Sequence, residues 1–401
     1  MKKIIYIIAS IAVILFSSCS DQLDIKSQMS LDADSELSVE DVDKLVNGVM
    51  QTVLSPHSYA YFVVLYPEIL SDNLEPVNFQ WGQVRDAYYH EVLADDILNS
   101  YLYPFMYTAI KRANVILGVP SASNSQKAIA RYCRAYSYMR LLDLYGEVPL
   151  IDETYDNEFV RKAKVERIWA FVIQDLEFAK TNAPEFNTSD PTANSYPTRE
   201  AAMALLARAY RLSGDIAKAG IEAENVIKTN KFPLATSMKS SESEIIMNFL
   251  QQPNTDKSYG EWGYIMSWEA RGWNCLALSP EIVDLIKGTT DTRVAWYDFD
   301  EAANRDGYVF PNMYKMNSDS ELFVSRIGEM YLVSAEAGNT NRLTEFQAIR
   351  KSNLSLANER RVELACQFVR WGDMKLAGET YIMPIPKASQ DANPHLSEPA
   401  E

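Results

Sequence analysis

The sequence predicts a mainly α-helical protein with a scaffold of stacked helical hairpins and a large irregular, loop-rich portion. Three observations lead to this fold class. One stretch has the spacing of a repeated helix pair, further amphipathic helices flank it, and aromatic-rich segments without a helical period lie between them. With 401 residues and 47% hydrophobic content, the chain can bury a large core.

The stretch 198–231 carries the clearest pattern. Its small and large apolar residues have the spacing of a tetratricopeptide helix pair: Leu206, Ala207, Tyr210, Ala219, Ala223 and Val226. Small residues let two antiparallel helices approach, Thr198 can cap the first helix, and Gly214 can end it. One such pair leaves an apolar outer face, so we expect neighbouring hairpins. An isolated helical hairpin in a mixed fold is the alternative.

The first eighteen residues are typical of a signal peptide. Lys2 and Lys3 precede an apolar run from Ile4 to Phe16, and small residues lead to Cys19. This pattern resembles a bacterial lipoprotein signal, in which Cys19 becomes the lipidated N-terminus. An ordinary secretory signal with an incidental cysteine is the alternative. Residues 19–37 are then a lipidated tether, and 38–401 a single domain with no other candidate membrane span.

Amphipathic patterns predict the helices of that domain in chain order. The expected helices before the hairpin are 38–54, 96–117, 125–145 and 165–180, and those after it are 326–337, 342–350 and 358–376. The first opens with a capping-box pattern, and the third stops at Gly146 before an extended Val148–Leu150. Loops are expected at 59–90 and 181–197, and 381–401 is expected to be irregular. The scaffold is thus mainly 38–235 and 326–376, and the loop-rich ligand portion mainly 55–95 and 244–325.

Composition excludes several kinds of function. The net charge of −16 argues against nucleic acid as a ligand. Removing the signal takes away two of the 38 basic residues and no acidic one, which leaves 36 against 54 and a net charge of −18. The three remaining cysteines, at 133, 275 and 366, are expected to be buried thiols, and no metal-ligand spacing, phosphate-binding glycine loop or nucleophile elbow is present. We expect no cofactor and no enzyme activity; a calcium site cannot be read from sequence, and a glycosidase built from two distant carboxylates is the alternative.

Aromatic residues in glycine-rich loops are the informative chemistry. The stretch 258–274 mixes indole and phenol rings with glycines and planar polar side chains, and the segment around residues 78–85 has a similar mixture. Sugar rings stack on flat aromatic faces, while their hydroxyl groups need polar partners. The candidate ligand-binding residues are Asn78, Trp81, Arg85, Tyr259, Trp262, Trp268 and Trp273. The alternative is that these rings fill a loop-rich hydrophobic region.

Two charged patterns have structural interpretations. Arg134, Tyr138 and Tyr145 recur on one helix face and can bridge to a neighbouring helix. Acidic and basic residues alternate from Glu359 to Arg370, which suits packing of the last helix against the array.

Several runs in a fixed order resemble one family, the SusD/RagB nutrient-binding outer-membrane lipoproteins of Bacteroidetes. The most specific run extends from Arg134-Ala135-Tyr136 to Val148-Pro149-Leu150. Others are Asp21–Asp24 after the lipidated cysteine, Ile110–Ile116, Arg326–Ala337, Arg370-Trp371 and Ile385-Pro386. The chain departs from the family at Gln367-Phe368 and in its short 244–326 portion.

The resemblance implies a function and partners. A protein of this family would capture an oligosaccharide at the cell surface, held to the outer membrane by its lipid. It would deliver the sugar to a SusC-like TonB-dependent transporter, over which it sits as a lid. Uptake of oligopeptides by the same architecture is the alternative. The family's ligand residues lie in variable loops, so none is carried over to this chain.

Overall fold

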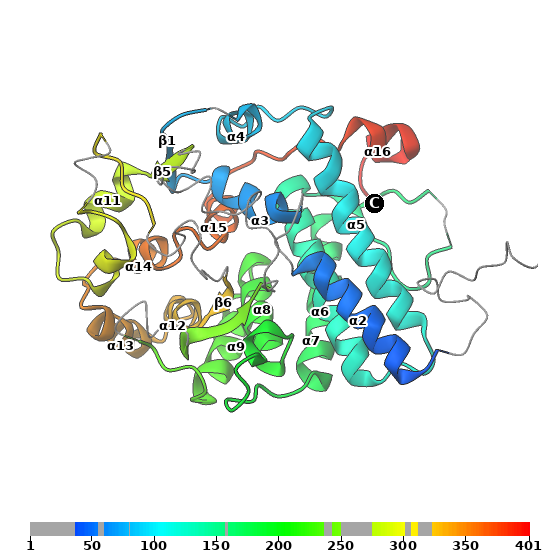
Figure 1. The fold of residues 1–401 in the computed structure, drawn as a ribbon, viewed down its shortest axis with the longest axis horizontal. Coiled ribbons are helices and arrows are strands. Elements are labelled where there is room, and N and C mark those ends of the chain that lie inside the picture. Colours follow the sequence, from blue (N-terminus) through cyan, green and yellow to red (C-terminus); the bar gives the residue numbers. More distant parts are fainter. Residues whose placement is uncertain are drawn as a thin grey trace, which may run out of the picture. The chain divides into compact units, whose positions relative to one another are not determined.

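Helices make up most of the computed structural model, as the sequence predicts (Figure 1). The structure describes residues 37–54, 60–79, 81–156, 159–235, 243–249, 275–300, 306–311 and 323–401. The chain divides into two units, Met1–Ser38 and Val39–Glu401, and the described elements lie in the second.

A stack of helices forms the scaffold. Its members are α5 (Ile97–Gly118), α6 (Asn124–Tyr145), α7 (Val165–Asn182), α8 (Arg199–Leu212), α9 (Ile216–Lys228), α12 (Ile327–Glu336) and α13 (Thr340–Arg350). Each packs against the next, and α9 packs directly on α12, so the array continues across the segment between them. The first helix, α2 (Val39–Val53), covers α5 and α6. The predicted hairpin array is therefore confirmed.

Local signals place the ends of these helices where the sequence predicts them. Thr198 accepts a hydrogen bond from the Ala201 N–H at 3.2 Å and caps α8. Gly214 has a φ of +93° in the turn between α8 and α9, and Gly146 has a φ of +67° after α6. Glycine adopts this left-handed region without the steric cost of a Cβ.

The segment 59–90 contains more regular structure than the loop expected there. It holds α3 (Ala60–Ile69), the short strand β1 (Leu74–Pro76) and α4 (Gly82–Tyr88). Both Leu65 and Tyr66 are buried, as are Ile69 and Leu70. The second half of α3 is thus buried on successive residues, and such a segment shows no amphipathic period, which is why the sequence pattern missed this helix.

The single helix expected at 358–376 is two helices, α14 (Leu356–Glu363) and α15 (Arg370–Leu376). Between them Cys366 and Phe368 have φ values of +60° and +61°. The buried carboxylate of Glu68 accepts both of their backbone N–H groups, at 2.8 and 2.9 Å, and stabilises this turn. The C-terminal stretch, expected to be irregular, also contains α16 (Lys387–Ala392) and a 3₁₀ turn at Pro394–Ser397.

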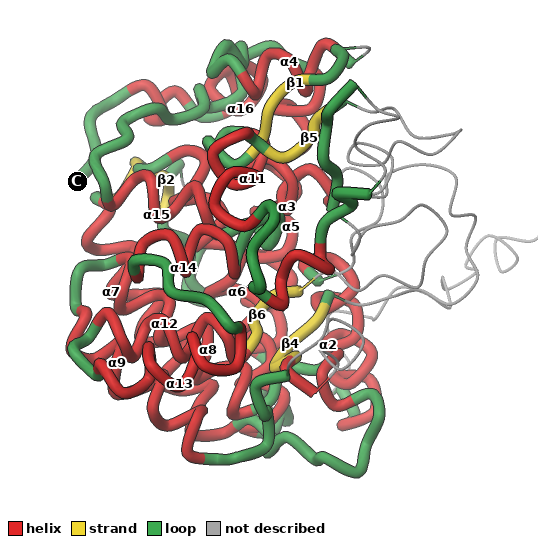
Figure 2. Tube along the Cα trace, turned by 90° about the vertical axis from the view of Figure 1, so that its left-hand side faces the viewer, coloured by secondary structure: helices red, strands yellow, loops and turns green. Residues whose placement is uncertain are grey.

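In the described part of the chain, three small antiparallel ribbons accompany the helices (Figure 2). They pair β1 with β5 (Leu276–Leu278), β2 (Val148–Pro149) with β3 (Lys162–Ala163), and β4 (Ile245–Asn248) with β6 (Phe323–Arg326). The helix α11 (Pro280–Ile286) and two 3₁₀ turns, η2 (Ala193–Ser195) and η4 (Thr292–Trp296), lie in the connections.

Arg134, Tyr138 and Tyr145 bridge helices as predicted. The Arg134 guanidinium donates to Asp175 on α7 at 2.7 and 2.9 Å. The ring of Tyr138 packs edge-on against Phe171 on α7 at 5.6 Å, while its hydroxyl donates to the Ile151 carbonyl in the loop after β2 at 3.1 Å. The Tyr145 hydroxyl donates to Asn99 on α5 at 2.8 Å. Cys133, Cys275 and Cys366 are buried free thiols, also as predicted.

The close approach of α9 and α12 gives a test of the array. A Cβ on Gly220 would overlap the Cβ of Ala337, whereas a Cβ on Gly118, at the end of α5, would meet nothing within 4 Å. We expect Gly220→Ala to lower the free energy of unfolding by about 1–3 kcal/mol, because the two helices must separate. Gly118→Ala should be neutral or slightly stabilising. Urea denaturation followed by circular dichroism measures both, and equal stability of the two variants would contradict this packing.

Candidate ligand-binding face

The β1–β5 ribbon pairs the strand that precedes residues 78–85 with the strand that follows the stretch 258–274, the two segments in which the sequence places ligand residues. The Val77 N–H donates to the Cys275 carbonyl at 2.9 Å, and Pro76 pairs with Leu276. Burial raises the pKa of Cys275 to about 11, although a hydrogen bond with the Trp81 backbone lowers it. The residue that follows the tryptophan-rich stretch 258–274 therefore lies beside Trp81, although nearly two hundred positions separate them in the chain.

Three of the predicted ligand residues lie together on this side of the fold. Asn78 and Trp81 are half-buried in the loop that leads into α4, and Arg85 is exposed on α4. The Trp81 carbonyl accepts from the Val84 and Arg85 N–H groups at 3.1 and 3.2 Å, which fixes Trp81 at the start of the helix.

The other predicted positions lie outside the described residues. These are Tyr259, Trp262, Trp268 and Trp273, together with the lipidation site Cys19. Their part in binding stays a prediction.

Sequence reasoning did not select Tyr89, which belongs to an aromatic cluster with Phe79 and Tyr88. The ring centroids of Tyr88 and Tyr89 are 5.1 Å apart and those of Phe79 and Tyr89 are 5.5 Å apart. Tyr89 is four residues after Arg85, and its N–H donates to the Arg85 carbonyl at 3.0 Å. This spacing is the signal that could have joined it to the candidate residues.

Carboxylates dominate the charge around α4. Asp86 Oδ1 accepts from Arg85 Nη2 and Nε at 2.6 and 2.9 Å. Hydrogen bonding to Asp86 raises the pKa of Arg85, and the charge of Glu91 adds to the rise. Burial, followed by repulsion from Glu281, raises the pKa of Glu75.

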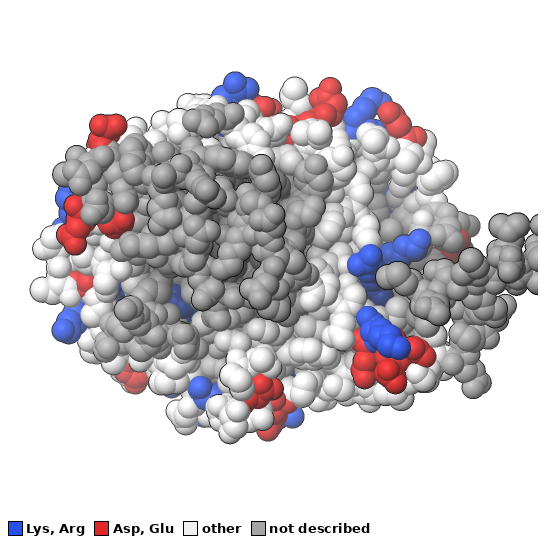
Figure 3. All heavy atoms as spheres, in the orientation of Figure 1, with Lys and Arg blue, Asp and Glu red and all other residues white. Residues whose placement is uncertain are grey.

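The same carboxylates act on the aromatic cluster. Burial is the main cause that raises the pKa of Tyr88, and electrostatic interactions with Tyr89, Glu75 and Glu281 raise this pKa further. In the described part of the face that Figure 3 shows, basic side chains form small separate groups. No extended basic stripe of the kind that binds nucleic acid is visible among those residues.

Arginines from the C-terminal helices hold the start of β1. Arg370 donates to both carboxylate oxygens of Asp72, at 2.6 and 2.7 Å, and Arg361 donates to the Asp72 carbonyl at 2.7 Å. Burial alone would raise the pKa of Asp72, but its bonds to Arg370 outweigh burial and lower it. The Asn73 carbonyl accepts from the Ser279 N–H at 2.9 Å. This bond joins the residue before β1 to the residue after β5 and fixes that end of the β1–β5 ribbon.

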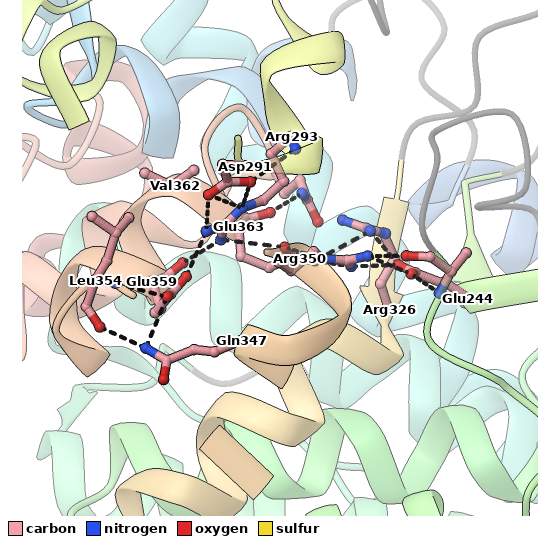
Figure 4. Close-up of polar contacts among 12 residues, drawn as sticks. Glu244, Asp291, Arg293, Arg326, Gln347, Arg350, Leu354, Glu359, Val362 and Glu363 are labelled. Carbon is pink, nitrogen blue, oxygen red and sulfur yellow. Dashed lines mark hydrogen bonds and ion pairs between the residues drawn. The ribbon is translucent and has the colours of Figure 1, made fainter. Parts of the chain in front are cut away.

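A buried arginine–carboxylate network lies beneath the short elements of the loop-rich portion (Figure 4). It contains Glu244, Asp291, Arg293, Arg326, Arg350, Glu359 and Glu363, all at most 5% exposed. Arg350 donates to Glu363 at 2.7 Å and to Glu244 at 3.0 Å, and Arg326 also pairs with Glu244. Burial would raise the pKa of Glu244, but Arg326 and Arg350 outweigh it and lower the pKa.

The network joins elements that are far apart in the chain. Glu244 directly precedes β4, Arg326 ends β6, and Glu363 ends α14. Arg360 and Asp373 add a bond of 2.8 Å between α14 and α15. The alternating charges from Glu359 to Arg370 are therefore structural, as predicted.

Among the described residues, none of the helices is long and apolar enough to cross a membrane. In the same part of the chain, no group of three or more His, Cys, Asp or Glu side chains could hold a metal ion.

Comparison with known proteins relates this chain to one family. The family model described as "Starch-binding associating with outer membrane", SusD-like, matches residues 21–211. SusD-like protein P2 of Formosa agariphila is 32% identical over 123 residues, which are 30% of this chain and 24% of the relative. The chain is therefore similar to SusD-like proteins over residues 21–211. The match spans about a quarter of that relative's length.

Solved structures show that the SusD-like fold extends over nearly all of the chain. A candidate sugar-binding protein of Bacteroides vulgatus has a TM-score of 0.77 at 21% identity, with 91% of this chain and 99% of that chain covered. A SusD superfamily protein of Bacteroides thetaiotaomicron gives 0.76 at 20%, with 90% and 99% covered. A laminarin-binding SusD-like protein gives 0.72 at 20%, with 88% and 97% covered.

The buried network makes a prediction about Arg350. Replacing it by methionine leaves Glu244 and Glu363 buried without their main partner, so we expect Arg350→Met to cost about 3–5 kcal/mol of stability. The control is Arg199→Met, because Arg199 pairs with Glu185 on the surface and such pairs contribute about 0–1 kcal/mol. Urea denaturation of both variants measures the difference. Similar losses would show that the network does not stabilise the fold.

Glu68 makes stability depend on pH. Burial raises its pKa from 4.5 to about 7, although bonds from Asn73 and from two backbone N–H groups oppose the rise. The pKa of Glu68 is higher in the folded protein than in the unfolded chain, so Glu68 contributes to the free energy of unfolding. This contribution is complete below pH 4.5 and is lost as the pH rises through 7. The difference between the two pKa values of Glu68 corresponds to about 3 kcal/mol of unfolding free energy.

Unfolding free energies of the wild type and Glu68→Gln, measured from pH 4 to about 8, isolate this effect. We expect the wild type to lose stability relative to the variant over that interval, since glutamine does not titrate. Parallel pH profiles would contradict the raised pKa.

Proposed function

We propose that this protein is a cell-surface lipoprotein that binds an oligosaccharide and delivers it to a SusC-like TonB-dependent transporter. The observation that carries the proposal is the candidate ligand-binding face. There, half-buried Asn78 and Trp81 and exposed Arg85 follow β1, which pairs with β5 directly after Cys275. An indole with planar polar neighbours suits a sugar ring, whose C–H faces stack on aromatics and whose hydroxyl groups need donors and acceptors.

The relatives support a glycan as ligand. The matching family model is described as starch-binding, and one similar structure is a laminarin-binding protein. These names guide the choice of sugars for the experiment.

The location and partner follow from the lipoprotein signal and from the family. Cys19 would carry the lipid that holds the chain to the outer membrane, with residues 19–37 as its tether. Affinity purification from outer membranes tests the partner: a TonB-dependent barrel should copurify with the chain. Its consistent absence would contradict the transporter assignment.

We infer binding without hydrolysis and without a cofactor. Incubation of a bound glycan with the purified chain should leave its length unchanged. Shorter products would instead support the glycosidase alternative. A loss of binding on chelation would reveal a calcium requirement.

Calorimetric titration of the full-length chain against a glycan panel and a peptide mixture tests the ligand class. The panel includes laminarin, soluble starch and other neutral and acidic polysaccharides. We expect saturable binding to at least one glycan and none to the peptides. Saturable binding to peptides alone would replace the glycan assignment by oligopeptide capture.

A further inference from the structure

Tyr89 is an aromatic side chain at the candidate ligand-binding face that is both fixed in orientation and open to solvent. It is 53% exposed. Tyr88 packs edge-on against it at 83°, and Phe79 packs at 55°. A ring held by two others needs little ordering when a ligand stacks on it, so less entropy is lost on binding. A core-filling role does not explain a ring that leaves half of its surface in water.

Polar groups suited to sugar hydroxyls lie one helical turn away. Arg85 Nε and Nη2 both donate to the same oxygen, Asp86 Oδ1. Arg85 Nη1 and Asp86 Oδ2 make no hydrogen bond to any of the described residues. A remaining donor and a remaining acceptor on one ion pair match two neighbouring hydroxyl groups of a pyranose.

The charges around this pair discriminate between classes of glycan. Four carboxylates act on Arg85 or Tyr88, those of Glu75, Asp86, Glu91 and Glu281. They are opposed by the guanidinium of Arg85 and, at Glu281, by that of Arg361, so negative charge remains in excess. Such a surface repels an approaching polyanion over about one Debye length, roughly 10 Å at 0.1 M salt. The same surface does not repel an uncharged sugar electrostatically.

We propose that Tyr89, Arg85 and Asp86 form a subsite for one uncharged pyranose of the glycan, and that the surrounding carboxylates exclude polyanionic polysaccharides. The ring of Tyr89 stacks on the sugar face, and the Arg85–Asp86 pair binds adjacent hydroxyl groups. This subsite rests on the proposed function, because it names the class of glycan and a position at which the same face binds it.

Calorimetric titration of the full-length chain in detergent tests the subsite, with laminarin and soluble starch as neutral probes and polygalacturonate and dextran sulfate as anionic ones. We expect Tyr89→Ala to weaken binding of the neutral ligand at least tenfold and Tyr89→Phe to stay within about twofold of wild type, because the ring face remains. The matched control is Tyr155→Ala, since Tyr155 is also exposed, at 40%, but lies in the loop between β2 and β3. Its affinity should equal that of wild type, and thermal melting confirms that each variant is folded.

The possible outcomes separate the two proposals. If the wild type binds a neutral glycan and Tyr89→Ala binds it equally well, the subsite is wrong and the proposed function stands. Binding of polygalacturonate or dextran sulfate as tight as that of the neutral glycan would overturn the charge selection. If the wild type binds no glycan, both the proposed function and the subsite that rests on it are wrong.

Discussion

The loop-rich portion of this protein depends on arginines that are buried against carboxylates. Arg350 connects Glu363 at the end of α14 to Glu244 beside β4, and Arg326 shares both acids. An ion that is removed from water needs a partner in a defined position, because an unpaired buried charge is costly. The network therefore specifies how short elements, which have too few residues to pack a core of their own, sit against the helical stack.

Because α9 packs directly on α12, the helical array is continuous although the chain leaves it for nearly a hundred residues. Small side chains make this contact possible, as Gly220 against Ala337 shows. Binding residues of proteins often lie on loops that a rigid scaffold positions, and Asn78 and Trp81 lie in such a loop.

Sequence patterns predicted the parts of the fold that are determined locally. The hairpin at 198–231 and the end of α6 follow from apolar spacing, caps and glycines, all read within a few residues. The turn at Cys366–Phe368 could not be predicted, because Glu68, some three hundred positions earlier, stabilises its left-handed residues. Helix α3 was missed because burial around its end hides the period.

The sequence indicated which types of residue form the candidate site but not how they are arranged in space. Mixed aromatic and polar residues indicated Trp81 and Arg85, but only the β1–β5 pairing shows that the strand before Trp81 lies beside Cys275 and β5. The spacing of Tyr89 from Arg85 could have added it to the candidate residues, but its exposure and its contacts with Phe79 and Tyr88 are visible only in the structure.

A crystal structure of the chain with a bound oligosaccharide would show where the ligand lies. We expect the sugar to lie against Trp81 and Arg85 beside the β1–β5 ribbon. A sugar bound on the surface of the α5–α9 stack, with this face empty, would contradict it.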